Sequence, residues 1–160
     1  RILFDPGAGN LNIPNDLLML PGDDGFFDYT LNIPVADPTN FGDPTNALNV
    51  LDGWSTNQPF VIDVVTPPGV SLDASTLSAG ISLYEATLGL NQADPVCAAI
   101  PVPSAGCKVG AKLTYGVDYV LSLLDSNTVT FVPLKPLKPS QGYMLVMDNN
   151  LKDSTGRSVR

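Results

Sequence analysis

This chain lacks some of the residue types that a hydrolase uses for catalysis. It has 160 residues and no histidine, which excludes a self-contained Ser-His-Asp or Cys-His site, a His-ligated zinc and an imidazole pH switch. The string closest to a nucleophile elbow is Gly53-Trp-Ser-Thr-Asn57, which lacks the second glycine of Gly-x-Ser-x-Gly. Because Ser55 has neither an elbow nor a base to activate it, we expect no catalytic residue here.

Aspartates offer a candidate calcium site. Calcium binds several carboxylate and carbonyl oxygens that lie close together. Two clusters contain such groups: Asp23 and Asp24 with Asp28, and Asp37 with Asp43. The alternative is turn capping, because Asp37 and Asp43 each begin a copy of Asp-Pro-Thr-Asn, and an aspartate before proline accepts hydrogen bonds from backbone amides two or three residues on. The sequence leaves both interpretations open and predicts no other cofactor.

Exposed aromatic rings are the residues on which a glycan-binding surface would depend. Trp54 and Phe41 are the candidates for such a surface, and Tyr84 and Tyr115 are further stacking candidates. The alternative is that these rings belong to the core, which is the commoner place for aromatic residues in a sandwich. Glycoside hydrolysis would need paired carboxylates, and the sequence does not place the single glutamate, Glu85, opposite a second one.

The two cysteines, Cys97 and Cys107, lie in a proline-rich stretch. A bridge between them would close a loop of about eleven residues and stabilise the fold by roughly 3 kcal/mol by restricting the unfolded chain. Their spacing excludes a C-x-x-C redox motif, and two cysteines without histidine make a poor zinc site. We therefore predict a structural disulfide, with two free thiols as the alternative. A disulfide would indicate an oxidising compartment.

Size and charge limit the class of protein. A chain of 160 residues with 44% hydrophobic composition fits one globular domain over residues 1–160. Its net charge is -8: residues 1–107 hold one basic and twelve acidic side chains, whereas residues 108–160 hold seven basic and four acidic ones. The lysines are dispersed, so we do not expect a nucleic-acid partner. No apolar run reaches the length of a membrane span.

Short β-branched and aromatic runs between prolines, glycines and aspartates predict an all-β, two-sheet antiparallel sandwich with long loops. The turn residues around Asp125 predict a hairpin, and alternation places Val129 and Phe131 in the core. Two helical turns are expected, one over residues 45–51 with a Thr45 cap and one over residues 73–77. The predicted strands cover residues 26–33, 60–65, 81–87, 108–115, 117–124, 128–134 and 143–148.

Several strings resemble the N-terminal region of bacterial extracellular, virulence-factor-type lipases. The resemblance is specific over about the first 65 residues, and the later residues are also similar to Ig-like modules of bacterial surface proteins. Its strings are Phe4-Asp-Pro6, Ile13-Pro-Asn-Asp-Leu-Leu18, Thr30-Leu-Asn-Ile-Pro-Val-Ala-Asp-Pro38, Ala47-Leu-Asn-Val-Leu-Asp-Gly-Trp-Ser-Thr56 and Pro59-Phe60, followed by Leu72-Asp-Ala-Ser-Thr-Leu77 and Leu151-Lys-Asp-Ser-Thr-Gly156.

The resemblance implies a domain organisation and a function. Residues 1–65 would form a family-specific, loop-rich part and residues 66–160 an Ig-like set of strands. In that family this region precedes an α/β-hydrolase domain, whose catalytic motif is not in this chain, so the chain would be a non-catalytic accessory domain of a lipase. The implied partners are the downstream hydrolase domain and a lipid or cell surface, and the implied location is secreted or anchored to the outer membrane of a Gram-negative bacterium.

The alternative function is an independent Ig-like binding or adhesion module for glycans or cell surfaces. This alternative predicts affinity of the isolated domain for polysaccharide, lost when Trp54 is replaced by alanine.

Overall fold

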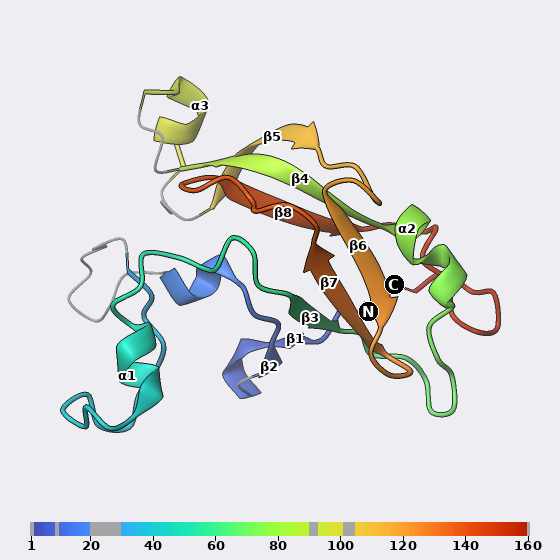
Figure 1. Ribbon diagram of the computed structural model, residues 1–160, viewed down its shortest axis with the longest axis horizontal. Coiled ribbons are helices and arrows are strands. Elements are labelled where there is room, and N and C mark those ends of the chain that lie inside the picture. The colour runs from blue at the N-terminus through green and yellow to red at the C-terminus, as the bar shows by residue number, and fades with distance from the viewer. Residues whose placement is uncertain (1, 9, 20–29, 90–92, 101–104, 160) are drawn as a thin grey trace.

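The computed structural model describes residues 2–8, 10–19, 30–89, 93–100 and 105–159 (Figure 1). Its long strands form two three-stranded antiparallel sheets, which confirms the predicted all-β sandwich. The first sheet has the order β3-β7-β6 and the second β5-β4-β8. The strands are β3 (Phe60–Asp63), β4 (Ile81–Leu88), β5 (Gly106–Lys112), β6 (Tyr119–Leu123), β7 (Thr128–Pro133) and β8 (Gly142–Met147).

The core lies between these two sheets. Phe131 of β7 is fully buried and stacks on Phe60 of β3 and on Tyr119 of β6, with ring centroids 4.7 Å apart in both pairs. Ile81 and Leu83 of β4 enter the same cluster from the second sheet. The buried members of this cluster are Ile62, Val64, Leu72, Leu77, Ile81, Leu83, Tyr119, Leu121, Val129, Phe131 and Leu151.

The predicted hairpin is present between β6 and β7. One carboxylate oxygen of Asp125 accepts hydrogen bonds from the backbone amides of Asn127 and Thr128, both at 2.8 Å. The strands then pair in register, with Leu121 opposite Phe131. Val129 and Phe131 point into the core as alternation predicted, since both are fully buried.

Two strand predictions in the second half end at different residues from the observed strands. The predicted strand over 108–115 ends at Lys112, and the strand predicted from Val117 begins at Tyr119. The reason is a turn between them. Asp118 donates its backbone N–H to the carbonyl of Thr114, while its side chain accepts from the Thr114 N–H, both at 2.8 Å.

The strand predicted over residues 26–33 is wrong where it can be judged. Residues 26–29 lie outside the described residues, and residues 30–33 belong to no strand. The backbone of Leu31 instead donates to the carbonyl of Leu51, and both backbone polar groups of Ile33 bond to the side chain of Asn49. A ladder cannot form because these partners come from a loop and a side chain rather than from a strand.

The described helices are short, and three of them follow an aspartate cap whose side chain accepts from the backbone. Asp43 caps α1 (Pro44–Leu48), Asp73 caps η3 (Ala74–Thr76), which continues into α2 (Leu77–Gly80), and Asp94 caps α3 (Pro95–Ala98). The predicted Thr45 cap of the first helix is wrong, because Asp43 accepts from the Thr45 N–H and places Thr45 inside the helix. This helix also ends at Leu48, before the predicted Leu51.

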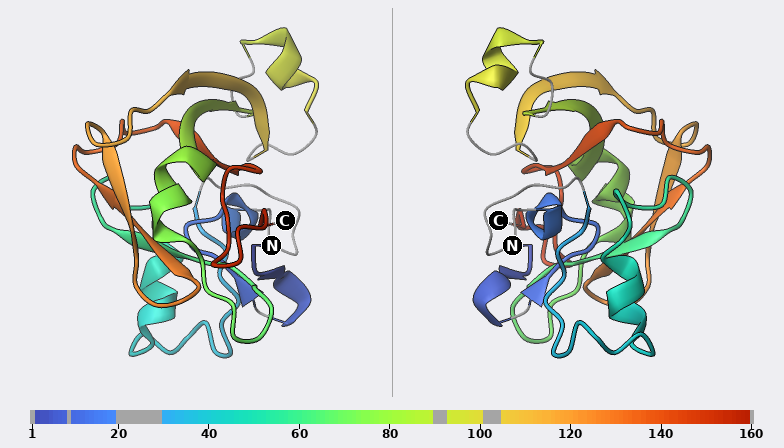
Figure 2. Two further views of the ribbon diagram at one scale, coloured as in Figure 1. Left: turned by 90° about the vertical axis from the view of Figure 1, so that its right-hand side faces the viewer. Right: turned by 90° about the vertical axis from the view of Figure 1, so that its left-hand side faces the viewer.

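The described part of residues 2–59 lies beside the sandwich and is joined to it by a bridge between Ile2 and Val64. It contains β1 (Phe4–Asp5), β2 (Asn10–Leu11), η1 (Pro6–Ala8), η2 (Asp16–Met19) and α1. The side views show the cyan segment with α1 on the opposite side of the sheets from the gold strand β5 (Figure 2). No helix in the described ranges is long and apolar enough to cross a bilayer.

Candidate functional site

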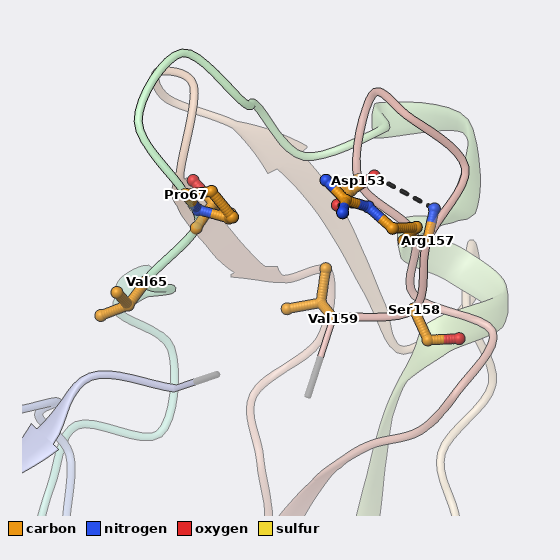
Figure 3. A pocket seen from close by; sticks show the side chains of 7 residues that line it. Val65, Pro67, Asp153, Arg157, Ser158 and Val159 are labelled. Carbon is orange, nitrogen blue, oxygen red and sulfur yellow. Dashed lines mark hydrogen bonds and ion pairs between the residues drawn. The ribbon is translucent and has the colours of Figure 1, made fainter.

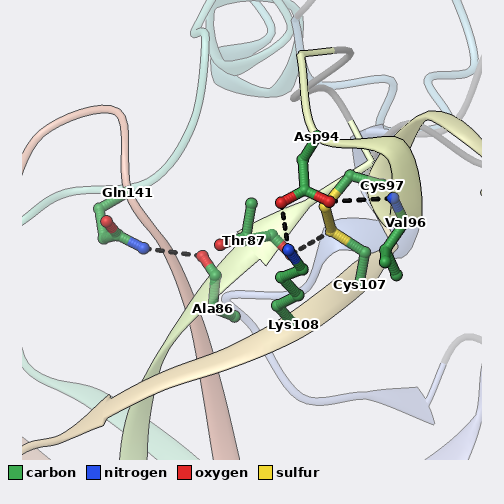
Figure 4. The surroundings of a disulfide bond; sticks show 8 residues. All are labelled: Ala86, Thr87, Asp94, Val96, Cys97, Cys107, Lys108 and Gln141. Carbon is green, nitrogen blue, oxygen red and sulfur yellow. Dashed lines mark hydrogen bonds and ion pairs between the residues drawn. A yellow bond between two sulfur atoms is a disulfide. The ribbon is translucent and has the colours of Figure 1, made fainter.

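A disulfide joins Cys97 of α3 to Cys107 of β5, with their Cα atoms 5.2 Å apart (Figure 4). It ties the short helix α3 to the edge strand of the second sheet, as predicted from the sequence. The Asp94 carboxylate accepts from the Val96 N–H at 2.9 Å and pairs with the ammonium of Lys108. The hydrogen bond from Lys108, followed by that from Val96, holds the pKa of Asp94 below its usual range.

The aspartates proposed as calcium ligands divide into two groups. Asp23 and Asp24 lie outside the described residues, so calcium binding there stays a prediction. Asp37 and Asp43 are turn caps: Asp37 accepts from the backbone and hydroxyl of Thr39, and Asp43 accepts from the Thr45 N–H. In the part of the chain that the structure covers, no three Asp, Glu, Cys or His side chains are grouped closely enough to hold a metal ion.

The aromatic candidates lie in different environments. Phe41 is 93% exposed at the turn between the two Asp-Pro-Thr-Asn repeats. Trp54 is partly buried, and its indole N–H is buried without a hydrogen-bond partner among the described residues. Lys112 lies over the ring of Tyr84, 5.8 Å from its centroid, and Tyr115 meets Tyr119 edge to face. The structure thus presents Phe41, and not Trp54, as an open ring.

The residues considered for hydrolysis are engaged locally. Ser55 donates its hydroxyl to Asn57 and accepts from the Gln58 N–H, at 3.0 and 3.2 Å. Glu85 forms an ion pair with Lys138 at 2.6 Å. Neither side chain has a neighbour that would serve as its general base or second carboxylate within these contacts.

A hollow of about 280 Å³ lies between the segment after β3 and the last described residues (Figure 3). Val65 and Pro67 form one wall, and Asp153, Arg157 and Val159 form the other. Asp153 is buried, and the hydroxyl of Thr155 donates to it at 2.6 Å; this bond, above all, lowers its pKa. Since the Asp153 carboxylate is held as a turn cap, the hollow contains no free acid or base.

Several large apolar side chains among the described residues of 2–59 are exposed. We expected a helical turn over residues 45–51 and made no prediction of how exposed Leu48 and Leu51 would be. Neither the order nor the spacing of these apolar residues in the sequence indicates their exposure. The exposed residues are Ile2, Phe4, Ile13, Leu17, Phe41, Leu48, Val50 and Leu51, with exposures from 38 to 93%.

Comparison with known families identifies the chain. It belongs to the family described as the bacterial virulence factor lipase N-terminal domain, whose model matches residues 16–160. The resemblance seen in the sequence is thereby confirmed.

One curated relative shows the setting of such a region. The chain is 36% identical over 96 residues to a protein named extracellular lipase from Aeromonas hydrophila. That match covers 60% of this chain and 13% of the relative. The matched region is therefore a small share of that relative's length. No solved structure matches the chain significantly.

Proposed function

We propose that this chain is a non-catalytic accessory domain of a bacterial lipase, which supports or positions the catalytic part of the same polypeptide. The family match over residues 16–160 is the observation that carries the proposal. The absence of histidine from the sequence agrees with it, because a lipase triad needs an imidazole base. The lipid-ester hydrolysis of the parent would be performed by residues outside this chain.

The fold suits a supporting role. Aromatic rings stack in the core of the sandwich, and aspartate side chains cap three of its short helices by hydrogen bonds. These contacts give the domain a defined surface on which another domain can pack. The described hollow and the ring of Phe41 offer no arrangement of acid, base and nucleophile. We therefore assign the domain a mechanical role and no chemical step.

Secretion is the second part of the proposal. The Cys97–Cys107 disulfide is stable in an oxidising compartment, and the Aeromonas relative is named as extracellular. A parent released into the medium and a parent anchored to the outer membrane would both place this domain in such a compartment.

A deletion tests the proposal. The parent lipase would be compared with a version that lacks residues 1–160, by expression level, thermal unfolding and activity on long-chain esters. We expect the shortened enzyme to be less stable and less active on long chains. Equal stability and activity of the two proteins would refute the supporting role.

A second experiment tests the non-catalytic assignment. The purified 160-residue chain should not hydrolyse a nitrophenyl ester above the rate of a heat-denatured sample. Turnover at an enzymatic rate by this chain alone would overturn the assignment.

A further inference from the structure

A second hollow, of about 350 Å³, lies where β5 ends and the chain turns into β6. The short helix α2 packs beside β6 at this end of the sandwich (Figure 1). A volume of this size is at the lower end of the range for small-molecule sites. All the lining residues belong to the described part of the chain, and they are Ser78, Lys112, Leu113, Thr114, Tyr115 and Tyr119.

Three hydroxyl groups at this hollow have no partner among the described residues. They belong to Ser78, Thr114 and Tyr115, and none of them makes a hydrogen bond within the part of the chain that the structure covers. A hydroxyl group can both donate and accept a hydrogen bond. Three such groups around one hollow therefore suit a ligand that itself carries hydroxyl groups.

Lys112 supplies a positive charge at the hollow. Of the other basic side chains in the described ranges, four pair with a carboxylate and Lys152 donates to the hydroxyl of Ser158. Lys112 has no ion pair or hydrogen bond to a described residue, and its ammonium lies 5.8 Å from the centroid of the Tyr84 ring. No carboxylate is among the lining residues. An unpaired ammonium beside a hollow without acidic groups favours a ligand that carries a negative charge.

Tyr115 provides a partly exposed ring whose position is fixed. Its side chain is 43% exposed, and its ring meets the buried ring of Tyr119 edge to face, with the centroids 5.9 Å apart. Two hydrogen bonds of 2.8 Å between Thr114 and Asp118 close the turn that carries Tyr115. The other carboxylate oxygen of Asp118 pairs with Lys135 at 3.3 Å, so this acid is engaged within its own surroundings. A ring held in this way loses little entropy when a ligand packs on it.

These groups distinguish between classes of small ligand. A phosphate group is held best by several converging donors, and one lysine is the only cation that lines this hollow. An acyl chain would cover the unpaired hydroxyls without bonding to them, which costs free energy. A saccharide can pack a face of its ring on an aromatic side chain and bond to hydroxyls, but a neutral one would leave Lys112 without a partner.

We propose that this hollow binds a saccharide unit that carries a carboxylate, such as a uronic acid. The sugar ring packs on Tyr115, its hydroxyls bond to Ser78 and Thr114, and its carboxylate accepts from Lys112. This binding activity is additional to the supporting role of the domain and does not depend on it.

Titration of the 160-residue chain by NMR tests the proposal with three matched probes. Glucuronate carries both the sugar ring and the carboxylate, glucose carries only the ring, and acetate carries only the carboxylate. We expect glucuronate to shift the amide signals of Lys112, Thr114 and Tyr115 saturably, with a Kd at least about fivefold below those of glucose and acetate. The absence of a saturable shift at these residues would overturn the proposal. Equal Kd values for glucuronate and either partial probe would also overturn it.

Two pairs of variants locate the binding. Lys112→Gln should remove the preference for glucuronate over glucose, whereas Tyr115→Ala should weaken the binding of both sugars. Lys138→Gln and Phe41→Ala are the matched controls, because they remove an exposed lysine and an exposed ring that do not line the hollow. The controls should leave the Kd for glucuronate unchanged. An unchanged Kd in Lys112→Gln, an exposed substitution that leaves the core intact, would refute the site.

Discussion

Residues 2–59 and residues 60–159 are stabilised by different means. The second region buries a continuous apolar cluster that includes the stacked rings of Phe60, Phe131 and Tyr119. Among the described residues of the first region, Met19 and Leu31 are the buried large apolar side chains, and side chains such as Asn12 and Asn49 hydrogen-bond to the backbone. A hydrogen bond contributes about 1 kcal/mol net, whereas burying a large apolar side chain contributes about 1.5–3 kcal/mol. From this comparison we expect the described part of the first region to contribute less to the free energy of unfolding than the second region does.

The largest expected difference between the regions comes from truncating one phenylalanine in each. Phe131→Ala should lower the free energy of unfolding by about 3–5 kcal/mol, because it removes a fully buried ring between two others. Phe41→Ala should change it by less than about 0.5 kcal/mol, because Phe41 is exposed. Urea unfolding of the 160-residue chain measures both. Similar losses would show that the first region has a core after all.

Removing the disulfide should act on the second region alone. The double substitution Cys97→Ser with Cys107→Ser should cost roughly 3 kcal/mol, because the unfolded chain regains the freedom of a short loop. Thermal unfolding measures this loss. Hydrogen exchange of the α1 amides should stay unchanged, since the disulfide ties α3 to β5. Faster exchange in α1 would mean that the two regions unfold as one unit.

The aspartate caps provide a matched pair with a smaller effect. Asp73 and Asp43 accept from the amide two residues on, at 3.0 and 2.9 Å. Asp73→Ala should cost about 1 kcal/mol of global stability, because the helical turns that it caps pack on the core through Leu77. Asp43→Ala should instead speed exchange of the Thr45 amide with little change in urea midpoint, because α1 buries no residue. A loss of about 1 kcal/mol of global stability in both variants would contradict the expected difference between the two regions.

Acid should weaken the second region through Asp153. The hydroxyl of Thr155 lowers the pKa of Asp153 below its usual value of 3.8. The carboxylate therefore contributes stability above that value, and the contribution is lost as the pH falls through the lowered folded pKa. Urea unfolding between about pH 5 and pH 2 should show a shallower decline for Asp153→Asn than for the wild type.

The matched control for the acid prediction is Asp37. Hydrogen bonds from Thr39 also lower its pKa, but it lies in the first region. Asp37→Asn should leave the acid dependence of global unfolding unchanged, because Asp37 is exposed and its hydrogen bonds from Thr39 stay within a surface turn. An equal change from Asp37→Asn would indicate cooperative unfolding of the whole chain.

The hairpin shows which parts of the fold were predictable. Its turn depends on Asp125 and the amides that follow, and its strands alternate within a few residues, so neighbours in sequence determine both. The strand predicted over 26–33 failed for the opposite reason. Whether residues 30–33 join a sheet depends on Asn49 and Leu51, which are distant in sequence and do not form a strand.

The candidate site was less predictable than the fold. The cysteine pairing followed from the presence of only two cysteines, and the caps at Asp37 and Asp43 followed from their position before proline. The exposure of Leu48, Val50 and Leu51 did not follow, because an apolar residue in or just after a short helix looks the same in sequence whether it faces a core, a partner or water. Trp54 was considered as an open ring, and its partial burial depends on its neighbours in space.

The sequence by itself determined the local and compositional properties: strand-forming runs, aspartate turns, one cysteine pair and the lack of an imidazole base. Tertiary structure alone decided the sheet orders β3-β7-β6 and β5-β4-β8, the stacking of Phe131 between two rings, and the close approach of Gly80 to Leu151, where an added Cβ would lie 2.3 Å from a backbone nitrogen. It also decided which apolar residues remain on the surface. The physical reason is that local properties depend on a few neighbouring dihedral angles and hydrogen bonds, whereas burial depends on which distant segments pack together.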